Sequence, residues 1–236
     1  MLTFLQIQAD SLAIAAQDIA ETTNSQNEIS ALGFILKGGV FMIPIILLFI
    51  YTIYLMIERY LYIRKATKGN KNDFNQVIDQ LNNGKLDTAL AITQRDSNAT
   101  LKVVEEGVLS IGRPIGEIEG NMERKASIEV GQMERKLSHL GLIAGIAPTL
   151  GFVGTILGVI KIFYNISISE NVSIGNISGG LYEKMISSGS GLIVGIIAYA
   201  AYHILNSIID NFTLKTQVNI LEFINTIQRP NGNQKK

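Results

Sequence analysis

The sequence predicts an all-α membrane protein with three transmembrane helices and long helices that extend into the cytoplasm. Three observations support this fold class. Hydrophobic residues make up 47% of the 236 residues, charged residues make up only 17%, and the mean hydropathy is +0.26. A soluble domain usually contains about 25% charged residues. The charge is missing from three apolar blocks, at residues 38–57, 140–160 and 185–209.

Each apolar block is long enough to cross a bilayer. The first two lack Asp, Glu, Lys and Arg, and the only titratable group of the third, apart from tyrosines, is His203. About 20 apolar residues in a helix span roughly 30 Å of hydrocarbon. The alternative is three buried helices of a soluble protein, which would need more surrounding protein than this chain supplies. We therefore expect a transmembrane helix in each block.

Basic residues predict the orientation of these helices. The first 36 residues contain four acids and no Lys or Arg, whereas five basic residues follow the first block closely: Arg59, Arg64, Lys65, Lys68 and Lys71. Cytoplasmic loops are enriched in Lys and Arg, so the N-terminus is expected to be periplasmic. The basic residues near the C-terminus predict a cytoplasmic C-terminus: Lys215, Arg229, Lys235 and Lys236.

This orientation divides the rest of the chain between two compartments. Residues 1–37 are a predicted periplasmic segment with an amphipathic helix on the membrane surface, and a disordered tail is the alternative. Residues 58–139 are a predicted cytoplasmic helical domain. Residues 161–184 are a predicted periplasmic loop, and residues 210–236 are a predicted cytoplasmic helix and tail.

The cytoplasmic segment shows helical spacing of apolar residues. This spacing predicts short helices at residues 73–81, 86–93 and 99–111, with a break at Arg113-Pro114. From Gly116 onward no breaker precedes the second apolar block, so we expect one continuous helix that enters the membrane. Its mixed charges fit either a solvated face with helix-spaced ion pairs or a surface that packs against copies of the same chain.

Small residues recur at helical spacing in the second and third blocks. Glycine lowers helix propensity but lets two helix backbones approach closely, so these positions are predicted helix-packing sites, within one subunit or between subunits. They are Ala147, Gly151, Gly154, Gly158, Gly191 and Gly195.

Three polar side chains near these stripes are candidates for an ion path. Thr155 lies in the second block, and Ser188 lies in a serine cluster of the third block. Such hydroxyls often bind carbonyls of their own helix, but several on small-residue helices also fit a narrow, weakly polar lumen. Glu183, beside Lys184, fits either an interfacial ion pair or an acid at a pore entrance.

Several functions find no support in the sequence. The formal net charge is zero, so no basic surface for nucleic acid is indicated. No catalytic constellation, metal-ligand spacing or cofactor motif is visible, and the chain has no cysteine. We therefore expect neither an enzyme nor a metal or cofactor site.

The apolar blocks also resemble a known family. The second block resembles the second span of ExbB and TolQ proteins, and the third resembles their last span, which identifies the chain with the ExbB/TolQ/MotA proton-channel family, closest to ExbB. The matching positions are Glu134-Arg135, residues 140–148, residues 150–158, Glu183, Ile186, Ser188 and Gly191-Leu192.

The resemblance implies a homopentameric ring in the lipid bilayer of a bacterial inner (cytoplasmic) membrane, with the second and third spans around a central pore. It implies a dimer of a single-span ExbD- or TolR-like partner inside the pore, whose transmembrane Asp carries protons, and a TonB- or TolA-like protein that receives the motion. By this resemblance Thr155, Ser188 and Glu183 lie along the proton pathway.

Two departures from the family pattern affect these roles. Ser188 stands where the family usually has Thr, and Lys184 stands where a small apolar residue is expected, so Lys184 could neutralise Glu183. A four-span MotA-type stator subunit is less compatible with three spans. A TolQ-like motor and a membrane scaffold without ion coupling remain alternatives.

Overall fold

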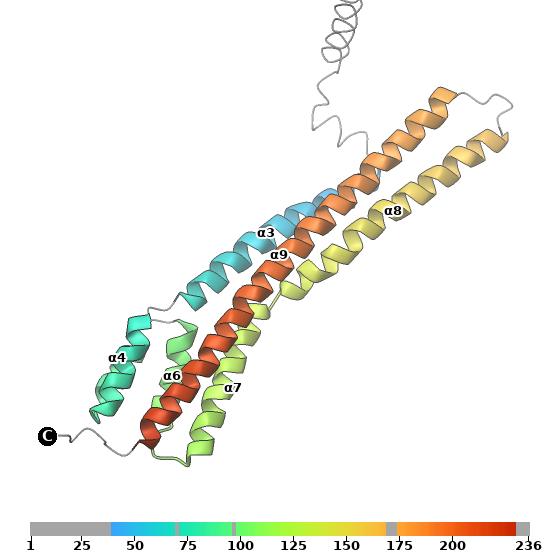
Figure 1. Cartoon of the computed structure of the whole chain (residues 1–236). Coiled ribbons are helices and arrows are strands. Elements are labelled where there is room, and N and C mark those ends of the chain that lie inside the picture. Colours follow the sequence, from blue (N-terminus) through green and yellow to red (C-terminus); the bar gives the residue numbers. More distant parts are fainter. Residues whose placement is uncertain (1–38, 69–70, 96–97, 169–173, 230–236) are drawn as a thin grey trace, which may run out of the picture.

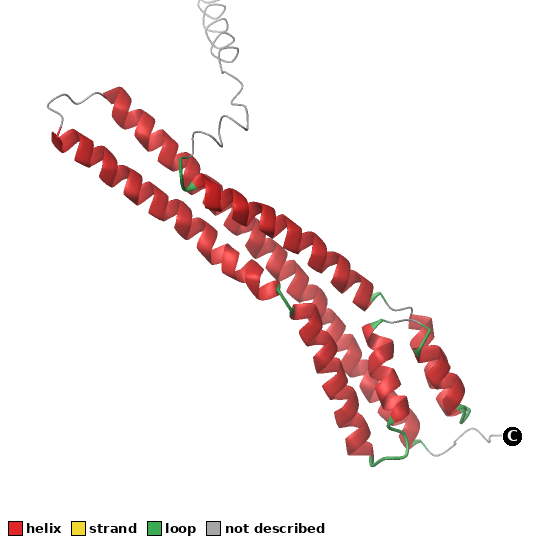
Figure 2. Cartoon of the chain, turned by 180° about the vertical axis from the view of Figure 1, so that it is seen from behind, coloured by secondary structure: helices red, strands yellow, loops and turns green. Residues whose placement is uncertain are grey.

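The computed structural model describes residues 39–68, 71–95, 98–168 and 174–229, and every regular element in these ranges is a helix (Figures 1 and 2). Three helical stretches are long and apolar enough to cross a membrane: they lie within Met42–Asn82, Ile115–Ile168 and Ile177–Gln228. Each overlaps one predicted apolar block, so the chain is an all-α membrane protein. The predicted amphipathic helix within residues 1–37 and the end of the tail, residues 230–236, lie outside the described residues.

Three long helices form the frame of the molecule. They are α3 (Met42–Thr67), α8 (Leu137–Ile168) and α9 (Ile174–Gln228). With 55 residues, α9 is about 80 Å long. It runs antiparallel to α8 and then continues past it, while α3 lies along the middle of α9 (Figure 1). Helices α8 and α9 also occupy most of residues 161–184.

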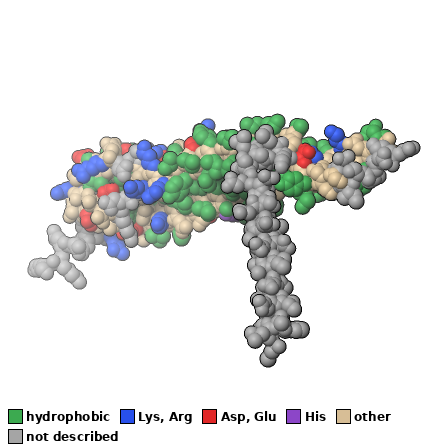
Figure 3. Space-filling model, turned by 90° about the horizontal axis from the view of Figure 1, so that it is seen from above, with side chains coloured by type: hydrophobic (Ala, Val, Ile, Leu, Met, Phe, Trp, Pro, Cys, Tyr) green, Lys and Arg blue, Asp and Glu red, His purple; other side chains and the backbone are tan. Residues whose placement is uncertain are grey.

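The helices divide the molecule into two halves. The apolar half consists of α3, α8 and residues 174–209 of α9. Its core is made of aliphatic side chains and alanines from all three helices: Ile45, Leu55, Leu140, Ile143, Ala198 and Leu205. Its outer face also exposes large apolar side chains, such as Ile43, Leu142 and Leu192. Figure 3 shows this apolar surface as a band, with most charged side chains gathered at one end. Such a band suits contact with lipid or with other apolar helices.

The polar half consists of short helices, α7 (Ile115–Glu134) and the end of α9 (residues 210–228). The short helices are α4 (Lys71–Asn82), α5 (Leu86–Thr93) and α6 (Ala99–Leu109), which confirms the three helices predicted there. The side-chain amide of Asn98 caps α6, because its oxygen accepts a 2.8 Å hydrogen bond from the Leu101 N–H. A second core of larger side chains joins these helices to α7 and α9: Phe74, Val77, Val104, Met122 and Phe223.

The prediction of one continuous helix into the second apolar block is wrong. Two residues, Arg135 and Lys136, separate the end of α7 from the beginning of α8, and this short link is visible between the two helices in Figure 2. Lys136 in this link has φ +71°, a left-handed conformation that residues other than Gly, Asn and Asp rarely adopt. A helix can therefore not pass through this position without interruption.

A buried arginine on α3 explains how the break is stabilised. Arg59 is 6% exposed, and its Nη1 donates to the carbonyl oxygen of Arg135 at 3.0 Å. The last carbonyls of a helix lack intrahelical partners, and the guanidinium supplies one. Glu58 forms ion pairs with Arg59 and, at 3.4 Å, with Lys136. The break thus depends on α3 side chains that lie about 75 residues earlier in the chain.

Candidate functional site

The candidate site lies where α8 packs against the beginning of α9. Thr155 on α8 is half-buried here. Its hydroxyl lies 3.1 Å from the carbonyl oxygen of Gly151 on its own helix and 3.2 Å from that of Lys184 on α9. A hydroxyl has one proton to donate, so the two carbonyls share it. Thr155 therefore connects the two helices as well as binding its own.

Glu183 and Lys184 form an ion pair at this level of α9. The Lys184 ammonium donates to the Glu183 carboxylate at 2.7 Å. The aliphatic part of Lys184 lies directly over Gly158, where an added Cβ would collide with its methylenes. The Glu183 carboxylate in turn lies against Gly39, just before α3. The acid is thus held between the beginning of the first span and its own neighbouring cation.

The serine cluster lies one turn further along α9. Ser188 is half-buried, and its Cα is 2.9 Å from the place where a Cβ on Gly151 would be. Ser187 is fully buried, and its hydroxyl has no hydrogen-bond partner among the described residues. The structure thus brings Thr155, Glu183 and Ser188 together within about two turns of each helix.

The small residues allow the close approach of these helices. An added Cβ on Gly191 would collide with the Ala147 carbonyl oxygen, and one on Gly195 would lie 2.5 Å from Pro148 Cγ. On α8, Ala147 and Gly151 face α9, whereas Gly154 faces the Phe41 side chain, whose atoms lie 3.0–3.2 Å from the added Cβ position. No larger residue fits these contacts without a shift of backbone or ring.

Chemically, this arrangement offers hydroxyls, carbonyls and one paired carboxylate. None of the three apolar blocks contains Asp or Glu. Among the described residues, no group of three or more His, Cys, Asp or Glu side chains is arranged to hold a metal ion. A hydroxyl chain can pass or orient a proton, but a carboxyl group that titrates in mid-membrane is not available within these blocks.

Two participants were not identified from the sequence. One is the Lys184 carbonyl oxygen, which accepts a hydrogen bond from the Thr155 hydroxyl. Every residue has a backbone carbonyl, so the sequence does not indicate which one takes part. The other is Ser187, which belongs to the predicted serine cluster but was not chosen as a site residue, although it is the fully buried serine. Its signal was available, because Ser187 continues the buried three-to-four spacing that runs through Gly191, Val194 and Ala198.

Comparison with known proteins places the chain in a family. The MotA/TolQ/ExbB proton channel family matches residues 91–218, more than half of the 236 residues and the whole of α6 through α8. A putative biopolymer transport protein ExbB homolog of Methanothermobacter thermautotrophicus is 29% identical over 177 residues, 74% of this chain and 62% of the relative. The chain thus spans less than two thirds of that relative's length.

Shorter matches involve two further relatives. The biopolymer transport protein ExbB of Neisseria gonorrhoeae is 34% identical over 70 residues, 30% of this chain and 32% of the relative. The Tol-Pal system protein TolQ of Haemophilus influenzae is 27% identical over 78 residues, 33% of this chain and 34% of the relative. Together with the family match over α6 through α8 and most of α9, these findings show that the chain belongs to the MotA/TolQ/ExbB proton channel family.

Proposed function

We propose that this protein is the ring-forming, ExbB-like subunit of an inner-membrane motor that is driven by the proton-motive force and energises TonB-dependent transport across the outer membrane. Five copies form a ring, with α8 and α9 of each copy around a central pore. A dimer of a single-span ExbD- or TolR-like protein occupies the pore, and a TonB- or TolA-like protein receives the motion. The observation behind this proposal is the Thr155 hydroxyl, which bridges the two helices that the family match includes.

The topology follows the charge distribution. Residues 38–57, 140–160 and 185–209 cross the membrane, with the N-terminus periplasmic and the C-terminus cytoplasmic. The polar half then lies in the cytoplasm, and the loop between the last two spans lies in the periplasm. The support is the gathering of Lys and Arg after the first block and at the C-terminus.

The proposal divides the chemistry between two proteins. This chain supplies a pore wall of hydroxyls and small residues, with Thr155 and Ser188 along the proton pathway and Glu183 at its periplasmic entrance. The partner supplies the carboxyl group that binds and releases the proton. The Lys184 ammonium, 2.7 Å from the Glu183 carboxylate, supports a smaller role for Glu183 than for Thr155, because the carboxylate already has a cation beside it.

Two other functions have some support. A TolQ-like motor for envelope maintenance is compatible with the TolQ match of Haemophilus influenzae. A membrane scaffold without ion coupling would also use close helix packing. A measurement of proton flux distinguishes the scaffold, which conducts no protons, from both motors. The identity of the partner that co-purifies with the chain distinguishes the two motors from each other.

The test is proton uptake by proteoliposomes that contain the complex purified with its partner. Thr155→Val removes the hydroxyl that reaches α9 and keeps the volume of the side chain. Loss of a hydrogen bond of about 1.4 kcal/mol at the rate-limiting step would lower the flux about tenfold. Thr149→Val is the matched control, because the Thr149 hydroxyl binds only carbonyls of its own helix, at 3.2 and 2.8 Å. Equal flux in both variants would contradict the proposed role of Thr155.

A further inference from the structure

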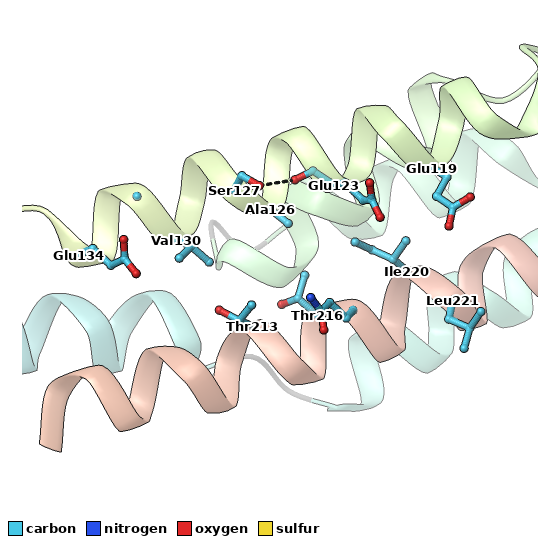
Figure 4. A pocket seen from close by; sticks show the side chains of 12 residues that line it. Glu119, Glu123, Ala126, Ser127, Val130, Glu134, Thr213, Thr216, Ile220 and Leu221 are labelled. Atoms are coloured by element: carbon cyan, nitrogen blue, oxygen red, sulfur yellow. Dashed lines mark hydrogen bonds between the residues drawn. The ribbon is translucent and has the colours of Figure 1, made fainter. Parts of the chain in front are cut away.

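In the polar half, α7 and α9 enclose a groove with a volume of about 400 Å³ (Figure 4). Three carboxylates from α7 lie along it, at Glu119, Glu123 and Glu134, and Thr216 from α9 faces it from the opposite side. Between these polar groups the groove wall is apolar, with Ala126 and Val130 among its residues. No Lys or Arg lines the groove.

Thr216 indicates that the groove has an occupant. Its side chain is 2% exposed, and its hydroxyl has no hydrogen-bond partner among the described residues. Threonines in helices usually donate to a carbonyl one turn earlier, as Thr213 does to Ile209 at 2.9 Å. A buried hydroxyl without a partner costs free energy, so native proteins rarely retain one that nothing fills. Thr216 faces the groove, where an occupant can supply the missing bond.

The carboxylates indicate that the occupant is cationic. No ion pair within the described part of the chain involves Glu119, Glu123 or Glu134. On the same helix, by contrast, Glu129 is 4% exposed and pairs with Lys102 at 3.3 Å and Lys125 at 3.6 Å. An acidic groove with an apolar wall suits a surface that presents cations on either side of an apolar residue.

Helix α7 and the residue that follows it, Arg135, present such cations. Arg124 directly follows Glu123 and is exposed, and Arg135 directly follows Glu134 and is exposed as well. Between the two arginines lies Ile128, which is 54% exposed. Successive residues of a helix point about 100° apart, so Arg124 lies on a different face of α7 from Glu123, and neither Arg124 nor Ile128 lines the groove. Glu123 and Glu134 are 11 residues apart on α7, or about 16 Å, and each is directly followed in the sequence by one of the two arginines.

We propose that the groove is the docking site for α7 of a second copy of this chain. The inference rests on the proposed ring, whose symmetry axis is perpendicular to the membrane. Rotation about this axis does not change the position of a residue along the axis. Arg124 of the next copy therefore lies level with Glu123 and pairs with it, and Arg135 of the next copy pairs with Glu134 in the same way. Ile128 of the next copy then faces the apolar wall. The contact joins two different surfaces, as a closed ring of more than two copies requires.

The test is charge reversal, followed by native mass spectrometry of the complex extracted from its membranes. Glu123→Arg together with Glu134→Arg places like charges opposite each other. Because like-charge contacts cost several kcal/mol, the fraction of chains in rings should fall at least about tenfold. Adding Arg124→Glu and Arg135→Glu to the same chain restores opposite charges and should restore the ring. Asp79→Arg with Asp87→Arg is the control, since it makes the same charge change at exposed positions on α4 and α5.

The outcomes separate this inference from the proposed function. A wild-type chain that forms no ring contradicts the proposed function, and the inference falls with it. A wild-type ring that tolerates the groove reversal as well as the control reversal overturns the inference alone. The inference also fails if the reversed ring stays intact but loses a smaller partner chain, because the groove then binds that partner. Loss of the ring with rescue by the second reversal supports the docking of α7.

Discussion

Helix α9 packs against its neighbours in different ways in the two halves of the molecule. In the apolar half it contacts α8 through backbone, because Gly151 and Gly191 leave no side chain between the helices. In the polar half, side chains such as Met122 and Phe223 fill the space between the helices, and α7 and α9 leave a groove. Where two helix backbones touch, there is no room for an added atom, whereas side chains between two helices can change rotamer to make room. We therefore expect the apolar half to be the more rigid part of the frame.

The largest effect is expected from an added methyl group in the apolar half. Gly151→Ala places a Cβ 2.9 Å from the Ser188 Cα and 3.1 Å from the Ser187 carbonyl oxygen, and these are backbone atoms that no change of rotamer can move away. We expect a loss of about 1–3 kcal/mol in the free energy of unfolding, measured by denaturant titration in detergent. Gly145→Ala on the same helix is the control. Nothing lies within 4 Å of its added Cβ, so helix propensity should stabilise it by less than about 1 kcal/mol. Equal losses in both variants would contradict the backbone contact.

The junction between the two halves should be nearly as sensitive. Arg59→Met removes the donor to the Arg135 carbonyl and leaves Glu58 without its nearest cation. We expect a loss of about 1–3 kcal/mol in the same titration, because buried acceptors lose their partner. Arg64→Met on the same helix removes an exposed 3.4 Å hydrogen bond to the Tyr60 hydroxyl and a guanidinium contact 5.8 Å from the centre of the same ring, and it should change stability by less than about 0.5 kcal/mol. If the two variants behave alike, Arg59 does not stabilise the helix break.

The matching substitution in the polar half should cost less. Gly107→Ala places a Cβ 2.6 Å from the Met122 sulfur and 2.9 Å from a Phe223 ring carbon. The Met122 side chain can change rotamer, and the gain in helix propensity offsets part of the strain, so we expect a loss of about 1 kcal/mol or less. The titration used for Gly151→Ala gives the comparison directly. A loss as large as that of Gly151→Ala would show that the two halves are equally rigid.

The smallest effect is expected at Ser187. Its hydroxyl is buried without a partner, so Ser187→Ala should leave stability unchanged or raise it by up to about 1 kcal/mol. Ser167→Ala serves as the comparison, because it removes an exposed 2.8 Å hydrogen bond to the Tyr164 carbonyl. A clear loss of stability in Ser187→Ala, measured in the purified complex, would show that this hydroxyl has a partner in the assembled protein.

Much of the fold could be predicted because local patterns determine it. Uncharged runs of about 20 residues marked the three long helices, and apolar spacing marked α4, α5 and α6. The break before α8 was missed because its cause is not local. Arg59 reaches the end of α7 from a different helix, and Lys136 alone gives no signal of a left-handed conformation.

The candidate site could be predicted only in part, because it also depends on contacts between residues that are far apart in the sequence. Glycine spacing and the hydroxyl of Thr155 are sequence features, and the structure places them on the facing sides of α8 and α9. Which serine of the cluster becomes buried depends on the rotation of α9, which requires the whole buried stripe to be read together. The path of the Lys184 side chain over Gly158 is a tertiary contact that no local pattern predicts.

The most direct measurement is native mass spectrometry of the wild-type complex, purified gently from its own membranes. The proposed function predicts a ring of five copies of this chain with a smaller number of single-span partner chains. A monomer or dimer without a partner would contradict the motor and leave Thr155 and Ser188 as packing residues of a membrane scaffold.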